Sequence, residues 1–146
     1  IDDRLNALRE GQIFGLEKSR AKIAQNRNKL SADSMDFQNA KMQYELEKTQ
    51  FDNSKKQHEA GLISLNEFLK RQGTFQDKFA KYNASENKYL ASKQELYQSL
   101  ADYNSTRAEY MDKIAKAESE KSYYQSYLAT SKGELSEKQN KYSNIQ

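Results

Sequence analysis

Few side chains in this 146-residue chain are suited to catalytic or metal chemistry. It has one histidine, His58, and no cysteine, whereas zinc and haem sites draw several ligands from these two residue types. Acidic residues alternate with lysines along the chain, there is no glycine-rich phosphate loop, and the net charge is only +3. That pattern is typical of solvated surface charge and too weak for a nucleic-acid surface. We therefore expect no catalytic residue, no metal, no cofactor and no nucleic-acid partner, and predict that the protein is not an enzyme.

The residues around Gly61 have a different chemistry, the hydrogen bonding of helix ends. Gly61 can adopt the left-handed conformation that closes a helix. Ser64 and Glu67 have the spacing of a capping box, in which the serine hydroxyl accepts the amide proton of residue 67 and the glutamate reaches back to the amide of residue 64. A helix end and a helix start this close together predict a reversal of the chain at residues 60–63.

The sequence before the reversal has the seven-residue repeat of a coiled coil. One series is apolar or aromatic, and a companion series three residues further on is small or polar: Leu16, Ile23, Leu30, Phe37, Tyr44, Phe51 and His58, with Ser19, Asn26, Asp33, Ala40, Glu47 and Ser54. This narrow seam predicts a helix over about residues 2–59 that pairs with one other helix. Gly11 and Gly15 weaken its first turns, so we expect fraying or a kink there. Helix-poor residues around Asp33 form a second weak point.

The sequence after the reversal repeats the pattern and predicts a second helix over about residues 64–144. The aromatic series is Phe68, Phe75, Tyr82, Tyr89, Leu96, Tyr103, Tyr110, Ala117 and Tyr124. The companion series that we expect in the seam is Leu65, Gln72, Phe79, Glu86, Lys93, Leu100, Arg107, Ile114, Lys121, Leu128, Leu135 and Tyr142.

Composition also favours an elongated all-helical fold. The chain has no proline, five glycines and 31% charged residues, so it cannot form the many turns of a globular domain. A polar composition is also typical of disorder, but the regular spacing of most of the sixteen aromatic residues argues against it. We predict one all-α domain over residues 1–146, a long antiparallel two-helix coiled-coil hairpin.

Folding the chain about residues 60–63 has two consequences. It places Phe37 near residues 86–89, and it uses up the first helix near Tyr124, so that residues 125–146 overhang. The overhang keeps the apolar residues Leu128, Leu135, Tyr142 and Ile145. We expect it to pack against an upstream segment or another copy of the chain, because an amphipathic helix needs a partner.

The turn also carries a family likeness. Gly61, Ile63, Ser64, Glu67 and Phe68 lie between two long heptad helices. This arrangement resembles the helical hairpin of bacterial membrane fusion proteins, or periplasmic adaptor proteins, of the haemolysin-secretion (HlyD) type. In that family the hairpin is inserted into a lipoyl-like domain, bundles with copies of itself into a tube and meets an outer-membrane channel at its tip. The complex exports toxins, peptides or drugs with an inner-membrane transporter.

One part of the turn departs from the family. Channel-docking members resemble one another in a tip pattern of Arg, Leu and Ser. Here Ser64 matches, but Gln57 occupies the Leu position and Asn53 the Arg position. The resemblance therefore favours a relative that lacks the channel contact, such as an accessory protein of a bacteriocin or peptide ABC exporter.

The function that the resemblance implies is that of an adaptor which bridges or extends a membrane export complex. We expect it to act by self-association and by contacts of the tip residues Gly61, Leu62, Ile63, Ser64 and Leu65. The alternative for Leu62 and Ile63 is that they only fill the end of the seam. Further partners would be a membrane transporter and an envelope channel where one exists, both reached through the full-length protein.

The expected location is extracytoplasmic, with a membrane anchor in the full-length protein. No apolar run approaches the roughly 20 residues of a membrane span, and the first residue is Ile rather than Met, which indicates a piece of a longer protein. The alternative function is a cytoplasmic coiled-coil scaffold or filament segment without an export role, in which residues 60–64 form only a kink.

Overall fold

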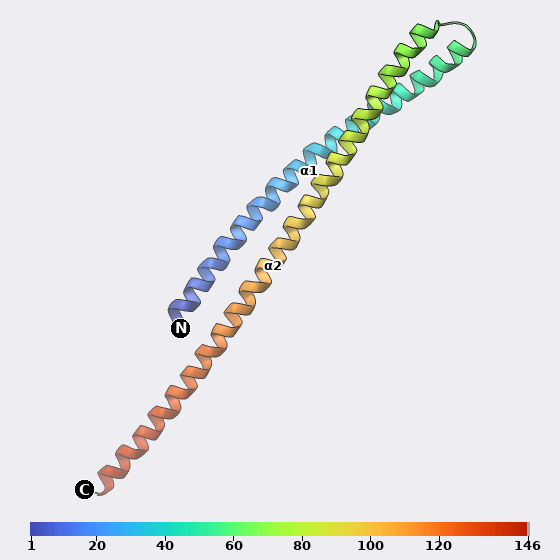
Figure 1. Cartoon of the computed structure of the whole chain (residues 1–146). Coiled ribbons are helices and arrows are strands. Elements are labelled where there is room, and N and C mark those ends of the chain that lie inside the picture. Colours follow the sequence, from blue (N-terminus) through green and yellow to red (C-terminus); the bar gives the residue numbers. More distant parts are fainter. Residues whose placement is uncertain (146) are drawn as a thin grey trace. The chain divides into compact units, whose positions relative to one another are not determined.

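The computed structural model describes residues 1–145, with side chains up to residue 144, and consists of two helices (Figure 1). They are α1 (Asp2–Glu59) and α2 (Leu65–Ile145), and no strand occurs among the described residues. The two helices pack against each other in antiparallel orientation. The predicted all-α, antiparallel two-helix coiled-coil hairpin is confirmed.

Both helices contribute to two compact units. Residues 21–100 form one, which contains the reversal and is called the turn unit here. Residues 1–20 together with 101–146 form the other, called the terminal unit. Each unit therefore contains a segment of α1 paired with a segment of α2.

The helix α1 ends in a Schellman motif. Gly61 has a φ of 74°, and its amide donates to the carbonyl of His58 (2.9 Å) while the amide of Leu62 donates to that of Gln57 (2.8 Å). These bonds occupy carbonyl groups that the end of a helix leaves without partners. The reversal follows from this closure, so the interpretation of residues 60–64 as a kink in a continuous helix is wrong.

The helix α2 begins with half of the predicted capping box. The amide of Glu67 donates to the Ser64 hydroxyl (3.1 Å), as expected for a serine N-cap. The Glu67 carboxylate does not complete the box, because it accepts instead from Nε of Arg71, one turn along α2 (3.2 Å). An i,i+4 partner of opposite charge was the stronger competitor for this carboxylate.

In the turn unit, eight rings form a stack that alternates between the helices and is called the ring column here. Its members are His58, Phe51, Tyr44 and Phe37 from α1, and Phe68, Phe75, Tyr82 and Tyr89 from α2. Successive ring centroids lie 4.7–5.8 Å apart with interplanar angles of at most 29°. Phe37 stacks on Tyr89 (5.4 Å), which agrees with the pairing expected from folding at residues 60–63.

The companion seam of α2 differs from the one predicted. Its most buried side chains are Ser92 (1% exposed) and Ser99 (2%), whereas Phe79 is 44% exposed. The serines come three residues after Tyr89 and Leu96, and the predicted series came four residues after them. Small hydroxyl side chains let the helices approach closely but carry no apolar signal in the sequence.

One of these serines bonds to a buried carboxylate. The Ser92 hydroxyl donates to Oδ2 of Asp33, whose side chain is only 4% exposed. Nζ of Lys88 lies 3.7 Å from the other carboxylate oxygen. The helix α1 runs without a break through this region, so the weak point expected around Asp33 is instead a polar layer across the seam.

In the terminal unit, two glycines make room for an aromatic ring. A Cβ atom on Gly11 or on Gly15 would lie 3.3 Å from a ring carbon of Tyr110, closer than carbon atoms normally approach. The residues between 11 and 15 are helical. The expected fraying is therefore not seen, because both glycines contribute to interhelical packing.

Ion pairs join the first turns of α1 to α2 in the same unit. They are Asp2–Lys121 (2.7 Å), Arg4–Glu120 (2.9 Å) and Arg9–Glu118 (2.9 Å). The Lys121 ammonium donates a hydrogen bond to the Asp2 carboxylate and attracts its charge, which lowers the pKa of Asp2. Because these groups are largely exposed, the pairs stabilise the hairpin only slightly and mainly fix the register between α1 and α2.

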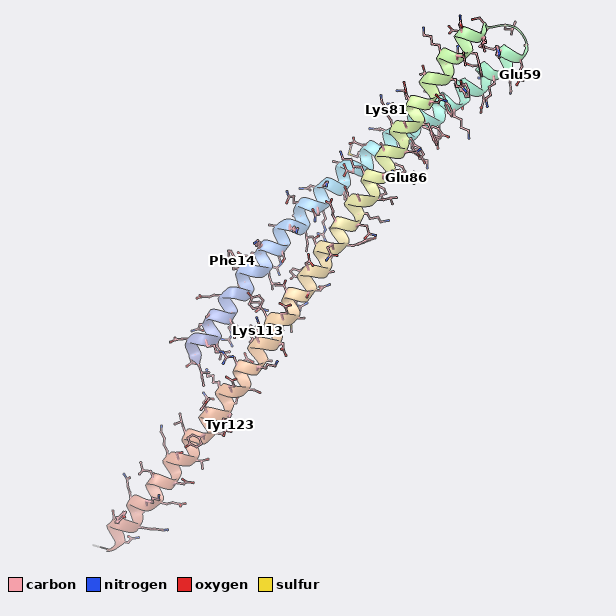
Figure 2. The ribbon with its side chains drawn as sticks, viewed as in Figure 1. Phe14, Glu59, Lys81, Glu86, Lys113 and Tyr123 are labelled. Carbon is pink, nitrogen blue, oxygen red and sulfur yellow. The ribbon has the colours of Figure 1, made fainter. Side chains whose placement is uncertain are left out.

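Beyond Lys121, α2 continues with exposed side chains. The apolar ones are between 51% and 73% exposed: Tyr123, Tyr124, Tyr127, Leu128, Leu135 and Tyr142. Figure 2 shows this part of α2, with Tyr123 labelled. The side chain of Ile145 and the whole of Gln146, which belong to the predicted overhang, lie outside the described residues.

Substitution of Gly61 by alanine is expected to destabilise the hairpin by about 1 kcal/mol, the cost of a left-handed L-residue. No atom lies within 4 Å of the point that a methyl group would occupy at Gly61 or at Gly73, so neither change causes a clash. Gly73→Ala is the matched control and should stabilise by up to about 1 kcal/mol, because residue 73 is helical. Urea unfolding followed by circular dichroism measures both, and equal shifts would contradict the prediction.

Candidate contact site at the turn

The five residues predicted as a tip contact surface differ in exposure. Leu62 is 75% exposed and Leu65 is 57% exposed, and Gly61 and Ser64 are exposed as well. Ile63 is half-buried. The apolar surface offered by these five residues therefore comes mainly from the two leucines.

A further leucine extends this surface. Leu69 is 50% exposed and lies four residues after Leu65, on the same side of α2. Sequence reasoning missed it because it considered only the residues that interrupt the heptads. Leu69 belongs to neither heptad series of α2, and an apolar residue outside both series was the signal that could have identified it. Leu62, Leu65 and Leu69 are called the tip leucines below.

The backbone of the turn is held in place by His58, which lies in the last turn of α1. Its ring stacks on Phe68, with centroids 4.7 Å apart and an interplanar angle of 8°. In the tautomer that carries its proton on Nδ1, His58 donates to the carbonyl of Ile63 (3.4 Å). The only histidine of the chain thus links the ring column to the turn and keeps Ile63 at the end of the seam.

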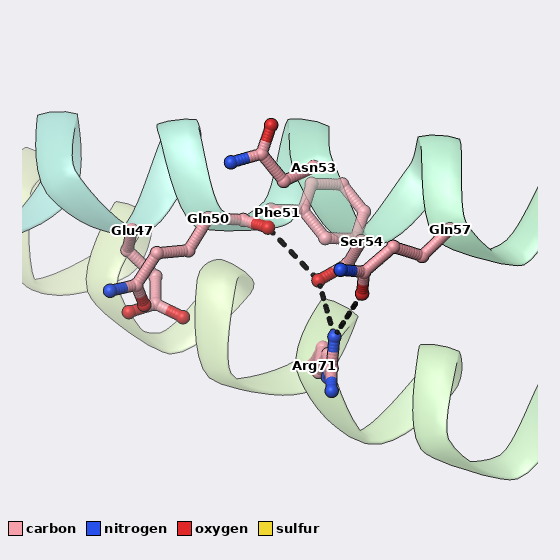
Figure 3. Close-up of a pocket in the computed structure, with 7 residues that line it drawn as sticks. All are labelled: Glu47, Gln50, Phe51, Asn53, Ser54, Gln57 and Arg71. Atoms are coloured by element: carbon pink, nitrogen blue, oxygen red, sulfur yellow. Dashed lines mark hydrogen bonds between the residues drawn. The ribbon is translucent and has the colours of Figure 1, made fainter. Parts of the chain in front are cut away.

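A second brace is provided by Arg71. Its Nη1 donates to the Ser54 hydroxyl (3.1 Å) and to Oε1 of Gln57 (2.9 Å) (Figure 3). Its Nε donates to the Glu67 carboxylate (3.2 Å). The Ser54 hydroxyl in turn donates to the carbonyl of Gln50 (2.9 Å). One guanidinium therefore ties the last turns of α1 to the first turns of α2. The sequence did not identify Arg71 as a seam residue, because seam positions are recognised by apolar side chains and Arg71 is charged.

The residues around Arg71 enclose a shallow hollow of about 300 Å³. Its lining consists of Glu47, Gln50, Phe51, Asn53, Ser54, Gln57 and Arg71 (Figure 3). A hollow of this size was not expected in a two-helix hairpin. Its two charged side chains are Glu47 and Arg71, and three protein acceptors already hold the guanidinium. Its guanidinium therefore acts as a brace between the two helices.

Two other kinds of site are not found among the described residues. No group of three or more histidines and acids in that part of the chain could hold a metal ion. Neither helix, as far as it is described, has a stretch long and apolar enough to cross a membrane.

Comparison with known proteins does not assign a family. No family model, curated protein or solved structure matches the chain. A function for the chain is therefore inferred from the geometry of the turn and from the surfaces of the two helices.

Proposed function

We propose that the chain is the coiled-coil hairpin of an extracytoplasmic adaptor that bridges or extends a membrane export complex for toxins, peptides or drugs. It has no catalytic role. It acts as a spacer that associates with copies of itself and contacts another component of the complex through the tip leucines. The full-length protein supplies the membrane anchor and the link to the transporter.

The observation that carries this proposal is the apolar surface at the turn. A solvent-exposed turn is normally built from polar and small residues, yet Leu62 is 75% exposed and Leu65 is 57% exposed. Full burial of one leucine is worth roughly 1.5–3 kcal/mol. Two or three leucines that became covered by a partner would provide a useful part of a specific binding energy.

The braces below the turn support the same role. His58 and Arg71 fix the turn from both helices, through the Ile63 carbonyl on one side and through Gln57 and Glu67 on the other. A contact surface that is already rigid loses little conformational entropy on binding.

Export by the full-length protein tests the proposal. Leu62→Asp combined with Leu65→Asp is expected to reduce export of the cargo by about tenfold or more, because each aspartate replaces apolar contact with a charge that must be desolvated. Both side chains are exposed to solvent, so the hairpin should keep its helix content and melting temperature. Ile63 is left unchanged because its half-buried side chain contributes to the end of the seam.

The matched control is Phe14→Asp. Phe14 is 72% exposed, in the terminal unit (Figure 2), so this change also adds one carboxylate in place of an exposed apolar side chain. Export should be unaffected by it. Unchanged export in the Leu62→Asp, Leu65→Asp variant, with the protein folded and present at normal levels, would rule out the tip contact.

A further inference from the structure

The hollow beside Arg71 contains hydrogen-bonding groups that the hairpin itself does not use. A guanidinium has five N–H groups. In Arg71, Nε donates to Glu67, and Nη1 donates to Ser54 and Gln57. The two N–H groups of Nη2 make no hydrogen bond to any residue whose side chain the structure describes. Since the side chain is 39% exposed, these two donors are open to a ligand.

Glu47 adds an acceptor to the same hollow. Its half-buried side chain lines the hollow beside the amides of Gln50, Asn53 and Gln57 (Figure 3). Within the part of the chain described with side chains, no hydrogen bond or ion pair engages the Glu47 carboxylate. A carboxylate accepts only, whereas each amide can both donate and accept. The hollow therefore combines an open donor, an open acceptor and groups that serve as either.

The open donor and the open acceptor are separated along α1. Figure 3 shows Glu47 on one side of the hollow, and Arg71 further along, where it bonds to Ser54. Glu47 and Ser54 are seven residues apart, which corresponds to about 10 Å of helix. An extended polypeptide rises about 3.3 Å per residue, so about three residues cover this length. The volume of about 300 Å³ holds about ten water molecules, which such a segment would displace.

The charges around the hollow favour an uncharged ligand. An anion that accepted from Arg71 would be repelled by Glu47, and a cation that donated to Glu47 would be repelled by Arg71. Phe51, which is only 6% exposed, adds an apolar part to the lining, and an ion loses hydration against apolar surface. A neutral group that accepts at one end and donates at the other suits all of these neighbours. The peptide group is such a group, because its C=O accepts and its N–H donates.

The hollow lies close to the tip leucines. Gln57 lines the hollow, and its backbone carbonyl accepts from the amide of Leu62 (2.8 Å). Asn53 lies one turn further from the tip. A polypeptide segment that covers Leu62 could therefore continue along α1 into the hollow without a reversal.

We propose that the hollow binds the main chain of an extended, uncharged polypeptide segment, with a carbonyl on Nη2 of Arg71 and an N–H on the Glu47 carboxylate. The segment belongs to the component of the export complex that covers the tip leucines, and in this respect the inference rests on the proposed function. The tip leucines supply apolar contact, and the hollow selects for a neutral main chain beside it.

A set of peptides of equal length tests the chemistry of the hollow on the hairpin alone. N-acetyl-triglycine amide is neutral, N-acetyl-triglycine carries one negative charge, and triglycine amide carries one positive charge. Each is titrated into the labelled chain, and the nitrogen–proton signals of the Arg71 side chain and of the Gln50, Asn53 and Gln57 amides are followed by NMR. We expect the neutral peptide to bind at least about threefold more tightly than either charged peptide. Such a short ligand binds weakly, so concentrations of about 0.1 M are needed.

Glu47→Ala and its matched control Glu45→Ala separate a binding role of Glu47 from a structural one. Glu45 is exposed and does not line the hollow. Glu47→Ala should weaken binding of the neutral peptide by about threefold and bring the affinity for N-acetyl-triglycine closer to it, because the repelling carboxylate is gone. Glu45→Ala should change neither affinity. Both variants should keep the helix content of the natural chain.

Three results would overturn the inference. They are the absence of any shift in these signals with the neutral peptide, binding of a charged peptide as tight as that of the neutral one, and equal shifts with glucose, a neutral ligand without a peptide group. The export test is a separate experiment. Selective binding of the neutral peptide together with unaffected export in the Leu62→Asp, Leu65→Asp variant would retain the hollow as a peptide site and remove the proposed function. No binding together with lost export would remove only this inference.

Discussion

Replacement of Phe51 by alanine is expected to destabilise the hairpin by about 3 kcal/mol or more, the usual range for a large aromatic residue in a core. Phe51 is 6% exposed and lies in the ring column between Phe68 (5.6 Å) and Phe75 (4.8 Å). Its removal would interrupt the stack and leave a gap that two helices cannot close by rearranging other layers. Stacked pairs also contribute beyond the area that they bury. Urea unfolding followed by circular dichroism would measure the loss.

Phe14→Ala is the matched control for this prediction. It removes the same atoms from a side chain that is 72% exposed, so its effect on the free energy of unfolding should stay within about 0.5 kcal/mol. If the two variants unfolded at the same urea concentration, the ring column would not be the main source of stability. The melting temperature provides an independent check, since the two changes should shift it by clearly different amounts.

The second large effect is expected at the buried pair of Ser92 and Asp33. Ser92→Ala removes the donor to Oδ2 of a carboxylate that is 4% exposed, and leaves Lys88 at 3.7 Å from the other oxygen. Loss of a hydrogen bond to a buried charged group costs roughly 1.5–3 kcal/mol. We expect Ser92→Ala to destabilise the hairpin by about 2 kcal/mol in the same urea measurement.

Removal of both partners should not lower the free energy of unfolding of the hairpin. The double variant Asp33→Leu with Ser92→Ala eliminates the buried carboxylate together with its donor, and apolar replacement of a buried polar pair is often neutral or stabilising. We expect it to be at least as stable as the natural chain. Ser99→Ala is the control, because the Ser99 hydroxyl donates only to the Leu96 carbonyl of its own helix (2.8 Å). A double variant less stable than Ser92→Ala would contradict this account.

Those parts of the fold that depend on strong local signals could be predicted from the sequence. Glycine at position 61 and serine at position 64 determined the reversal, because a left-handed cap and an N-cap each have few alternatives. The aromatic series, including Phe37 and Phe51, determined the seam of α1 because large apolar residues at a seven-residue interval have only one buried arrangement. The pairing of the helices then followed from the position of the turn.

Features that depend on contacts between the helices could not be predicted in this way. The buried serines of α2 are small and polar, so their burial is visible only once the distance between the helices is known. Gly11 and Gly15 are weak points in an isolated helix, and only the ring of Tyr110 beside them shows why they are there. Likewise, the Glu67 carboxylate could accept from the Ser64 amide or from Arg71, and the sequence does not show which of these two donors it binds.

Within the candidate site, the sequence indicated the tip but not its support. The apolar character of Leu62 and Leu65 was evident, whereas the half-buried Ile63 agrees with the alternative that it fills the end of the seam. Arg71 gave no signal, since a guanidinium inside a seam is recognised only by the acceptors around it. The proposal of a tip contact therefore came from the sequence, and the reason to regard the tip as rigid came from the structure.

The position of the turn also determines the order in which the hairpin can form. Arg71 reaches Gln57 across 14 residues of chain, whereas Arg4 reaches Glu120 across 116. If the short loop at the turn closes first, each later contact between the helices closes only a few further residues. The entropy of loop closure is then lost in small increments, although the final contacts join residues far apart in the sequence. We therefore expect folding to close the helices in sequence from the turn, and unfolding to begin at the ion pairs of the terminal unit. A hairpin that opens from its termini would in this way keep its contact surface assembled until the last step of opening.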